Sequence, residues 1–254
     1  MAKSLNTILK EICAESLGKL LPRDGFEESP SKGRHPSISA QYHRFAADRI
    51  CVVDVQRDKY WTNRKGRYCI NLWILFPKVG DFSATDLLTV IYSSENFDVQ
   101  ERLGILATGS DYWWELKRGW FFSESRTVET LASELREKWV SFGKPWFESI
   151  PDMRAARDYL AAGWGKGVAI SMSIALGETV EARELFIDSL CLRYRPPEDV
   201  LVRDQNRGLI SEAEAHALPR LLMQDEDALR RGLEELFGRS QPRSVPSSYS
   251  VTSK

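Results

Sequence analysis

The sequence predicts an α+β fold in which an antiparallel sheet is packed by helices and followed by an all-helical C-terminal extension. Two observations predict the sheet: apolar, β-branched runs at 50–55 and 68–76 flank a polar, basic segment that contains Gly66. This pattern is typical of a long antiparallel hairpin. A third observation predicts the helices, because apolar residues recur at helical spacing before the hairpin and throughout the chain after Ser149.

The chain before the hairpin predicts a helix, a loop and a strand. Residues 3–21 place apolar side chains on one helical stripe, and Pro22 and Gly25 would end that helix. The segment 27–36 is polar and contains proline and glycine, which favours a loop. Residues 38–45 alternate loosely between apolar and polar side chains, so we expect a first strand.

The second strand of the hairpin is expected to lie in the centre of the sheet. Both of its faces are apolar, and Pro77 would end it because proline cannot donate to the ladder. Cys51 and Cys69 lie on the two strands and could face each other, so their pairing stays open. Since the four cysteines are well separated and form no CxxC motif, we expect reduced thiols in a cytoplasmic protein.

Shorter elements follow the hairpin. Residues 87–92 are apolar and fit either a helical turn or a strand. Two aromatic clusters between residues 112 and 122, separated by the charged turn ELKRG, predict a second hairpin. Residues 128–142 repeat apolar side chains at helical spacing, and Gly143 and Pro145 would close that helix.

The C-terminal part is expected to be helical as far as residue 238. Helices are predicted at 153–162, 168–176, 179–193 and 225–237. The tail 239–254 has almost nothing to bury, which predicts disorder. We therefore divide the chain into an α+β domain at 1–150, a helical extension at 151–238 and the disordered tail.

The composition predicts an ordinary core and an uneven distribution of charge. Of the 254 residues 43% are hydrophobic, no apolar run reaches the ~18 residues of a membrane span, and the N-terminus has no signal-peptide pattern. Residues 1–80 contain 14 basic and 8 acidic residues, a net charge of +6, whereas 81–254 contain 21 and 28, a net charge of −7. The basic excess lies at the hairpin tip, which indicates either an acidic partner or a solvated loop.

No catalytic, metal or cofactor motif is found in the sequence. The histidines His35, His43 and His216 have no partners at ligand spacing, and there is no GxSxG motif or protease-type cysteine. The glycine segment 163–167 precedes an apolar helix, as phosphate-binding loops do, but it lacks their spacing. We therefore favour a connection between helices for this segment.

Polar residues interrupt the apolar strands of the hairpin. Asp54 lies between two valines, and Asn71 lies similarly in the partner strand. One interpretation is a site on one sheet face, formed by Asp54, Gln56 and Asn71 with Arg57. The other, which we favour, is that this face is only partly covered or that the groups bond each other, since buried polar groups need hydrogen bonds.

The hairpin tip combines basic and aromatic residues. They are Arg57, Lys59, Tyr60, Trp61, Arg64, Lys65 and Arg67. Aromatic rings stack on bases while lysine and arginine contact phosphates, so the tip is a candidate nucleic-acid site. Against this interpretation, the whole protein is not basic, no RNA-binding motif is present, and Trp61 could fold back onto the sheet.

Several short motifs occur in a distinctive order: a helix ending before Gly25-Phe26, then VDVQRD, INLWILFP, ERLGIL, the pair Trp113-Trp114 and GKPWFESI. This order resembles a bacterial family of uncharacterised proteins, one of the domain-of-unknown-function families, over about residues 5–160. The chain departs from the family at Trp73, where the family has a small residue. The resemblance implies an α+β domain of bacterial origin and supplies no catalytic residues. By analogy with similar small families, it also implies an immunity or contact role in toxin systems.

These observations favour a cytoplasmic, non-enzymatic protein-binding module, with an immunity-type protein of a toxin system as its specific form. One alternative is a nucleic-acid-associated protein that uses the basic aromatic tip. The other is an enzyme with an unrecognised site near Asp54 and Asn71. We expect a protein partner and no membrane association.

Overall fold

The computed structural model describes residues 3–30, 35–80, 98–117, 124–163, 165–178, 180–182 and 184–186. The chain divides into two compact units, 1–177 and 178–254, and every element named below belongs to the first. The predicted fold class is confirmed, because an antiparallel sheet is packed by helices and further helices follow it. The predicted domain boundaries stay a prediction.

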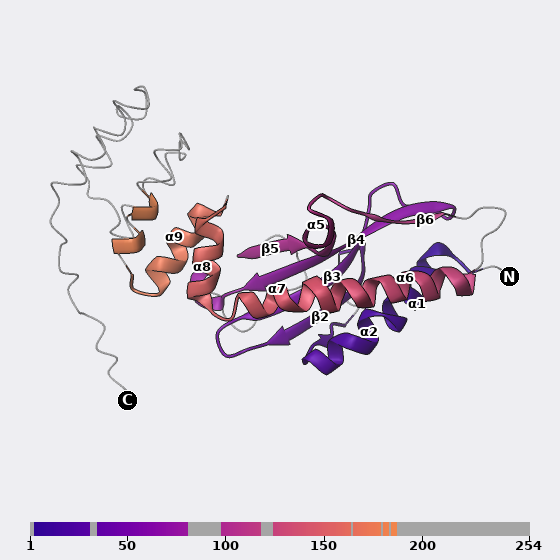
Figure 1. The fold of residues 1–254 in the computed structure, drawn as a ribbon, viewed down its shortest axis with the longest axis horizontal. Coiled ribbons are helices and arrows are strands. Elements are labelled where there is room, and N and C mark those ends of the chain that lie inside the picture. Colours follow the sequence, from indigo (N-terminus) through magenta and orange to yellow (C-terminus); the bar gives the residue numbers. More distant parts are fainter. Residues whose placement is uncertain are drawn as a thin grey trace, which may run out of the picture. The chain divides into compact units, whose positions relative to one another are not determined.

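The sheet is built around one long central strand (Figure 1). Its strands are β1 (Glu27–Glu28), β2 (Ile38–Phe45), β3 (Ile50–Arg57), β4 (Lys65–Leu75), β5 (Val99–Arg102) and β6 (Trp114–Lys117). The order is β1-β2-β3-β4-β5, and β6 pairs with the first part of β4 while β5 pairs with the second. The predicted hairpin of β3 and β4 and the central position of β4 are therefore confirmed.

The helices surround this sheet in sequence order. They are α1 (Leu5–Glu15), α2 (Leu17–Leu20), α3 (Pro77–Gly80), α5 (Leu103–Thr108), α6 (Glu124–Lys138), α7 (Lys144–Ser149), α8 (Met153–Ala161) and α9 (Lys166–Ala175). Helix α1 begins where the Ser4 side chain accepts a hydrogen bond from the Thr7 N–H, which satisfies a backbone donor that the helix leaves unpaired. Helices α1 and α6 contact each other (Figure 1).

One face of the sheet packs into the main core. Alternate residues of the hairpin, such as Val53 on β3 and Ile70 and Leu72 on β4, are fully buried with Leu5 and Ile8 of α1. Each buried aliphatic side chain contributes roughly 1.5–3 kcal/mol to folding. The intervening residues point to the opposite face, because side chains alternate along a strand. This alternation places the polar residues of the hairpin away from α1.

Three expectations about local structure are wrong. The predicted helix 3–21 is interrupted at Ser16, whose hydroxyl donates to the Ile12 carbonyl at 2.6 Å. Part of the predicted turn ELKRG forms strand β6, since Leu116 is buried against the core. The rest of that second hairpin lies outside the described residues.

The third correction concerns the end of the helix at 128–142. Gly143 does not end it, because the chain continues from α6 through a π-helical turn, Trp139–Gly143, into α7. The Trp139 ring packs so closely on Gly143 that a Cβ there would lie 2.6 Å from it. Pro145 lies in the first turn of α7, where its missing N–H costs no helical hydrogen bond.

Other predictions fall in several places. Cys51 lies opposite Ile74 and Cys69 opposite Gln56, so the two thiols are not paired with each other, and both are free. The first strand and the helix at 153–162 are confirmed, and the predicted helix at 168–176 corresponds to α9. The segment 87–92, most of 179–193, the helix 225–237 and the tail 239–254 lie outside the described residues.

Candidate functional site

The hairpin tip, residues 57–67, is held by its own backbone. The Asp58 N–H donates to the Arg67 carbonyl and the Thr62 N–H to the Lys65 carbonyl, both at 2.9 Å. The Thr62 hydroxyl also donates to the Lys65 carbonyl, at 2.8 Å. These bonds close the turn independently of any partner, so the tip is a preformed surface.

Trp61 folds back onto the sheet, which was the alternative to its exposure. Its ring covers Gly66 so closely that a Cβ on Gly66 would lie 2.3 Å from it. The Arg57 guanidinium lies 5.9 Å from the centre of that ring and donates to Asn6 of α1 at 2.9 Å and to the Pro36 carbonyl. Trp61 and Arg57 are therefore engaged in holding the tip to the rest of the domain.

Arg67 is also engaged within the domain. It forms an ion pair with Asp58 at 3.1 Å, and its guanidinium lies 5.6 Å from the centre of the Trp113 ring. The tip residues that stay exposed are Lys59, Tyr60, Arg64 and Lys65, and Tyr60 is 65% exposed. A hollow of about 610 Å³ lies among the tip residues and reaches Glu115 of β6.

The polar residues inside the hairpin form a hydrogen-bonded group. Asp54 is opposite Asn71, and its Oδ1 accepts from Asn71 Nδ2 at 2.8 Å. Its Oδ2 accepts from the Trp73 indole N–H at 2.6 Å, and Asn71 Nδ2 also donates to Gln56 Oε1 at 2.9 Å. The groups bond each other, as favoured from sequence. Arg57 does not join them, because it points to the other face of β3.

Burial dominates the electrostatics of Asp54. Its side chain is 1% exposed, and loss of solvation raises the pKa of its carboxyl from the usual 3.8 to about 6, although the bonds from Asn71 and Trp73 oppose this. Asp98, which accepts the Phe76 N–H at 2.6 Å, also has its pKa raised to about 6 by burial.

A pocket of about 290 Å³ opens next to this group. It is lined by Gln56, Asn71, Trp73, Glu101, Arg102 and Ile105, among others. Arg102 of β5 lies opposite Asn71, so Asp54, Asn71 and Arg102 form one row across three strands. Sequence reasoning missed Arg102 and Trp73 as parts of this site, since the signal was the register of β5 on β4, which no local pattern carries.

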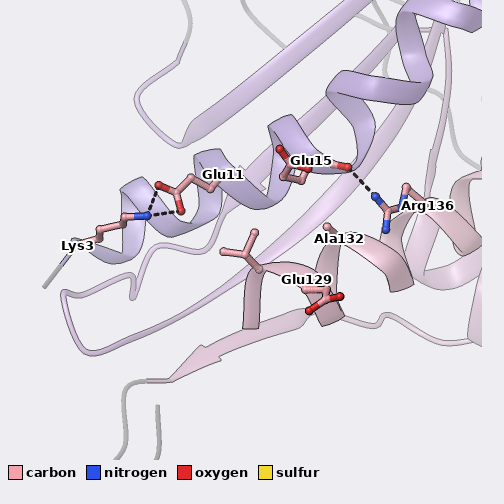
Figure 2. A pocket seen from close by; sticks show the side chains of 7 residues that line it. Lys3, Glu11, Glu15, Glu129, Ala132 and Arg136 are labelled. Atoms are coloured by element: carbon pink, nitrogen blue, oxygen red, sulfur yellow. Dashed lines mark hydrogen bonds and ion pairs between the residues drawn. The ribbon is translucent and has the colours of Figure 1, made fainter. Parts of the chain in front are cut away.

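A third hollow, of about 710 Å³, lies between α1 and α6 (Figure 2). Its charged groups are largely paired: Lys3 forms an ion pair with Glu11 at 2.7 Å, and Arg136 donates to the Glu15 carbonyl at 3.0 Å. We see no convergence of unsatisfied groups in this hollow that would mark a ligand site.

Metal and membrane features are limited to what the described residues show. Among them, no group of three or more histidine, cysteine, aspartate or glutamate side chains could hold a metal ion. His43 shares a hydrogen bond with Ser29 at 2.8 Å, and His35 shares one with Ser37 at 2.7 Å. In the same part of the chain, no helix has the length and apolar character needed to cross a membrane.

Fold and surfaces together define an α+β domain whose central antiparallel hairpin carries a basic tip and a polar group on one sheet face. Residues 37–149, from β2 to the end of α7, match a family described as a domain of unknown function (DUF4304). The predicted resemblance to such a family is thereby confirmed, while bacterial origin stays a prediction. No curated protein shows a significant match. No solved structure does so either.

Proposed function

We propose that this chain is a non-enzymatic, cytoplasmic protein-binding module of bacterial origin that uses its hairpin tip to contact an acidic protein surface. One observation carries the proposal: Tyr60 is exposed beside Lys59, Arg64 and Lys65 on a turn that is already fixed by backbone hydrogen bonds. Tyrosine and arginine are enriched at protein interfaces, and a preformed loop loses little entropy on binding. An immunity-type role in a toxin system is the specific form of this proposal.

The arrangement favours a protein over a nucleic acid. Stacking on bases requires an accessible aromatic face. Trp61 lies against Gly66 and the core, which leaves Tyr60 as the exposed ring of the tip, with the Lys59 ammonium already 5.0 Å from its centre. Arg57 and Arg67 are held by partners within the domain, so they add less to phosphate binding than their number in the sequence suggests.

A photocrosslinking experiment tests the proposal in cells of the source organism. A photoreactive phenylalanine analogue at position 60 should crosslink to one protein, whereas the same analogue at Val140, which is 57% exposed but remote from the tip, should not. Arg64→Glu with Lys65→Glu should abolish the crosslink by reversing the local charge. The matched control, Lys10→Glu with Arg23→Glu, makes the same change in net charge at other exposed residues and should leave it intact.

Two outcomes would overturn the proposal. A crosslinked product that is removed by nuclease would show that the tip binds nucleic acid instead. A protein crosslink that survives Arg64→Glu with Lys65→Glu but is lost in the control would place the interface elsewhere on the domain.

A further inference from the structure

The pocket beside Asn71 offers a second surface, independent of the tip. Its floor belongs to β4, its walls to β3, β5 and α5, and its residues come from segments about 30 to 50 positions apart in the chain. Sites built on strands hold side chains in fixed geometry. The indole N–H of Trp73 is bonded to Asp54 at 2.6 Å, which fixes the orientation of that ring at the edge of the pocket.

The charged groups around the pocket are already neutralised. Arg102 forms an ion pair with Asp111 at 2.7 Å, and this bond holds the pKa of Asp111 below its usual value. Glu101 accepts hydrogen bonds from the Arg102 N–H at 2.9 Å and from the Tyr159 hydroxyl at 3.2 Å. A phosphate or carboxylate ligand would have to displace Asp111 and approach Glu101. The pocket is therefore better suited to an uncharged ligand.

Two amide side chains supply the remaining polar groups. Gln56 uses its Oε1 to accept from Asn71, so its Nε2 remains as a donor beside the pocket. Asn71 Oδ1 accepts, among the described residues, one long contact of 3.5 Å from the Cys69 thiol, so it retains capacity as an acceptor. A neighbouring donor and acceptor are complementary to the edge of another amide.

We propose that this pocket binds a small, planar, uncharged molecule with a carboxamide or lactam edge, which pairs with Gln56 and Asn71 while its ring contacts Trp73 and Ile105. The volume of about 290 Å³ lies at the lower end of the range for ligand sites, which suits a ligand of one or two rings. Nucleobases and pyridine carboxamides share this chemistry.

Heteronuclear NMR on the full chain tests the proposal. Uracil and nicotinamide are the two probes, and nicotinate is the charged counterpart of nicotinamide. The Trp73 indole signal, assigned with Trp73→Phe, should shift on titration with at least one uncharged probe and should respond at least about tenfold more weakly to nicotinate, the factor expected when one good hydrogen bond is replaced by a repulsive contact. A response to uracil alone would identify a nucleobase site, and one to nicotinamide alone a pyridine carboxamide site.

Two variants locate the binding. Gln56→Glu removes the donor and should weaken binding about tenfold, whereas Asn63→Asp makes the same chemical change at an exposed position of the tip and should have no effect. Ile105→Phe narrows the pocket and should weaken binding even if Gln56→Glu fails to fold. The proposal is overturned if neither uncharged probe shifts the Trp73 signal at millimolar concentration, if nicotinate binds as well as nicotinamide, or if Ile105→Phe binds like the wild type.

Discussion

Asp54 makes the free energy of unfolding depend on pH in a direction opposite to that of most carboxylates. Its pKa is about 6 in the folded protein and close to 3.8 when solvated. Between these values the unfolded chain releases a proton that the folded chain keeps, so stability falls as the pH rises from 4 to 6 and then levels off. The contribution is therefore largest in acid and is lost through this window.

The size of this effect follows from the shift. Each pKa unit corresponds to about 1.36 kcal/mol, so a shift of roughly two units corresponds to about 3 kcal/mol across the whole window. Between pH 5 and 7.5 the linkage relation leaves roughly 1.4 kcal/mol of this decrease. Because Asp54 is 1% exposed, screening by solvent reduces this value little.

Asp54→Asn removes the titration while keeping the size of the side chain. An amide cannot accept from both Asn71 Nδ2 and the Trp73 indole N–H, so the variant loses one hydrogen bond at every pH, which costs about 1–3 kcal/mol. This cost is independent of pH, and the titration of Asp98 is common to both proteins. The difference in stability between variant and wild type should therefore shrink by about 1.4 kcal/mol from pH 5 to pH 7.5.

Urea unfolding of both proteins, followed by tryptophan fluorescence at several pH values, measures this difference. The slope of each transition should stay constant, so that midpoints can be compared. A difference that does not change with pH, or that grows as the pH rises, would refute the assignment of Asp54 as a buried acid with a raised pKa.

Two further substitutions test contacts that hold the domain together. Gly66→Ala should lower the free energy of unfolding by about 1–3 kcal/mol and expose Trp61, because the new Cβ would meet its ring; Gly167→Ala, where a Cβ meets nothing within 4 Å, should be neutral or slightly stabilising in urea unfolding, and equal effects of the two would contradict the packing of Trp61. Asp24→Ala should cost about 1–3 kcal/mol, because it leaves the buried Trp139 indole N–H unpaired. Lys144→Met, which removes the more exposed partner of Asp24, should cost less than about 1 kcal/mol in the same assay, and a larger loss than that of Asp24→Ala would reverse this ranking.

Elements whose evidence lies within a few neighbouring residues could be predicted from sequence. The hairpin of β3 and β4 is an example, because alternation and apolar runs are local properties of a strand. The mutual bonding of Asp54 and Asn71 followed from the same pattern, since a buried polar group in one strand needs a partner in the next.

Features that depend on distant packing could not be predicted. Gly143 and Pro145 are ordinary helix-ending signals, but the Trp139 ring occupies the space beside Gly143 and the helix continues past it. Arg102 joins Asn71 through the register of two strands that lie about 30 residues apart in the chain, and no local pattern specifies such a register.

The two proposed surfaces depend on one property of the hairpin, its register. Residues of even number on β3, Asp54 and Gln56, face the pocket, whereas Arg57 faces α1, and a slip of one residue would exchange these faces. At the tip, the bond from Arg57 to Asn6 and the packing of Trp61 on Gly66 each require the observed register. We therefore infer that these tip residues keep Asp54 out of the main core, and that Arg57 and Trp61 support the polar pocket although they lie outside it.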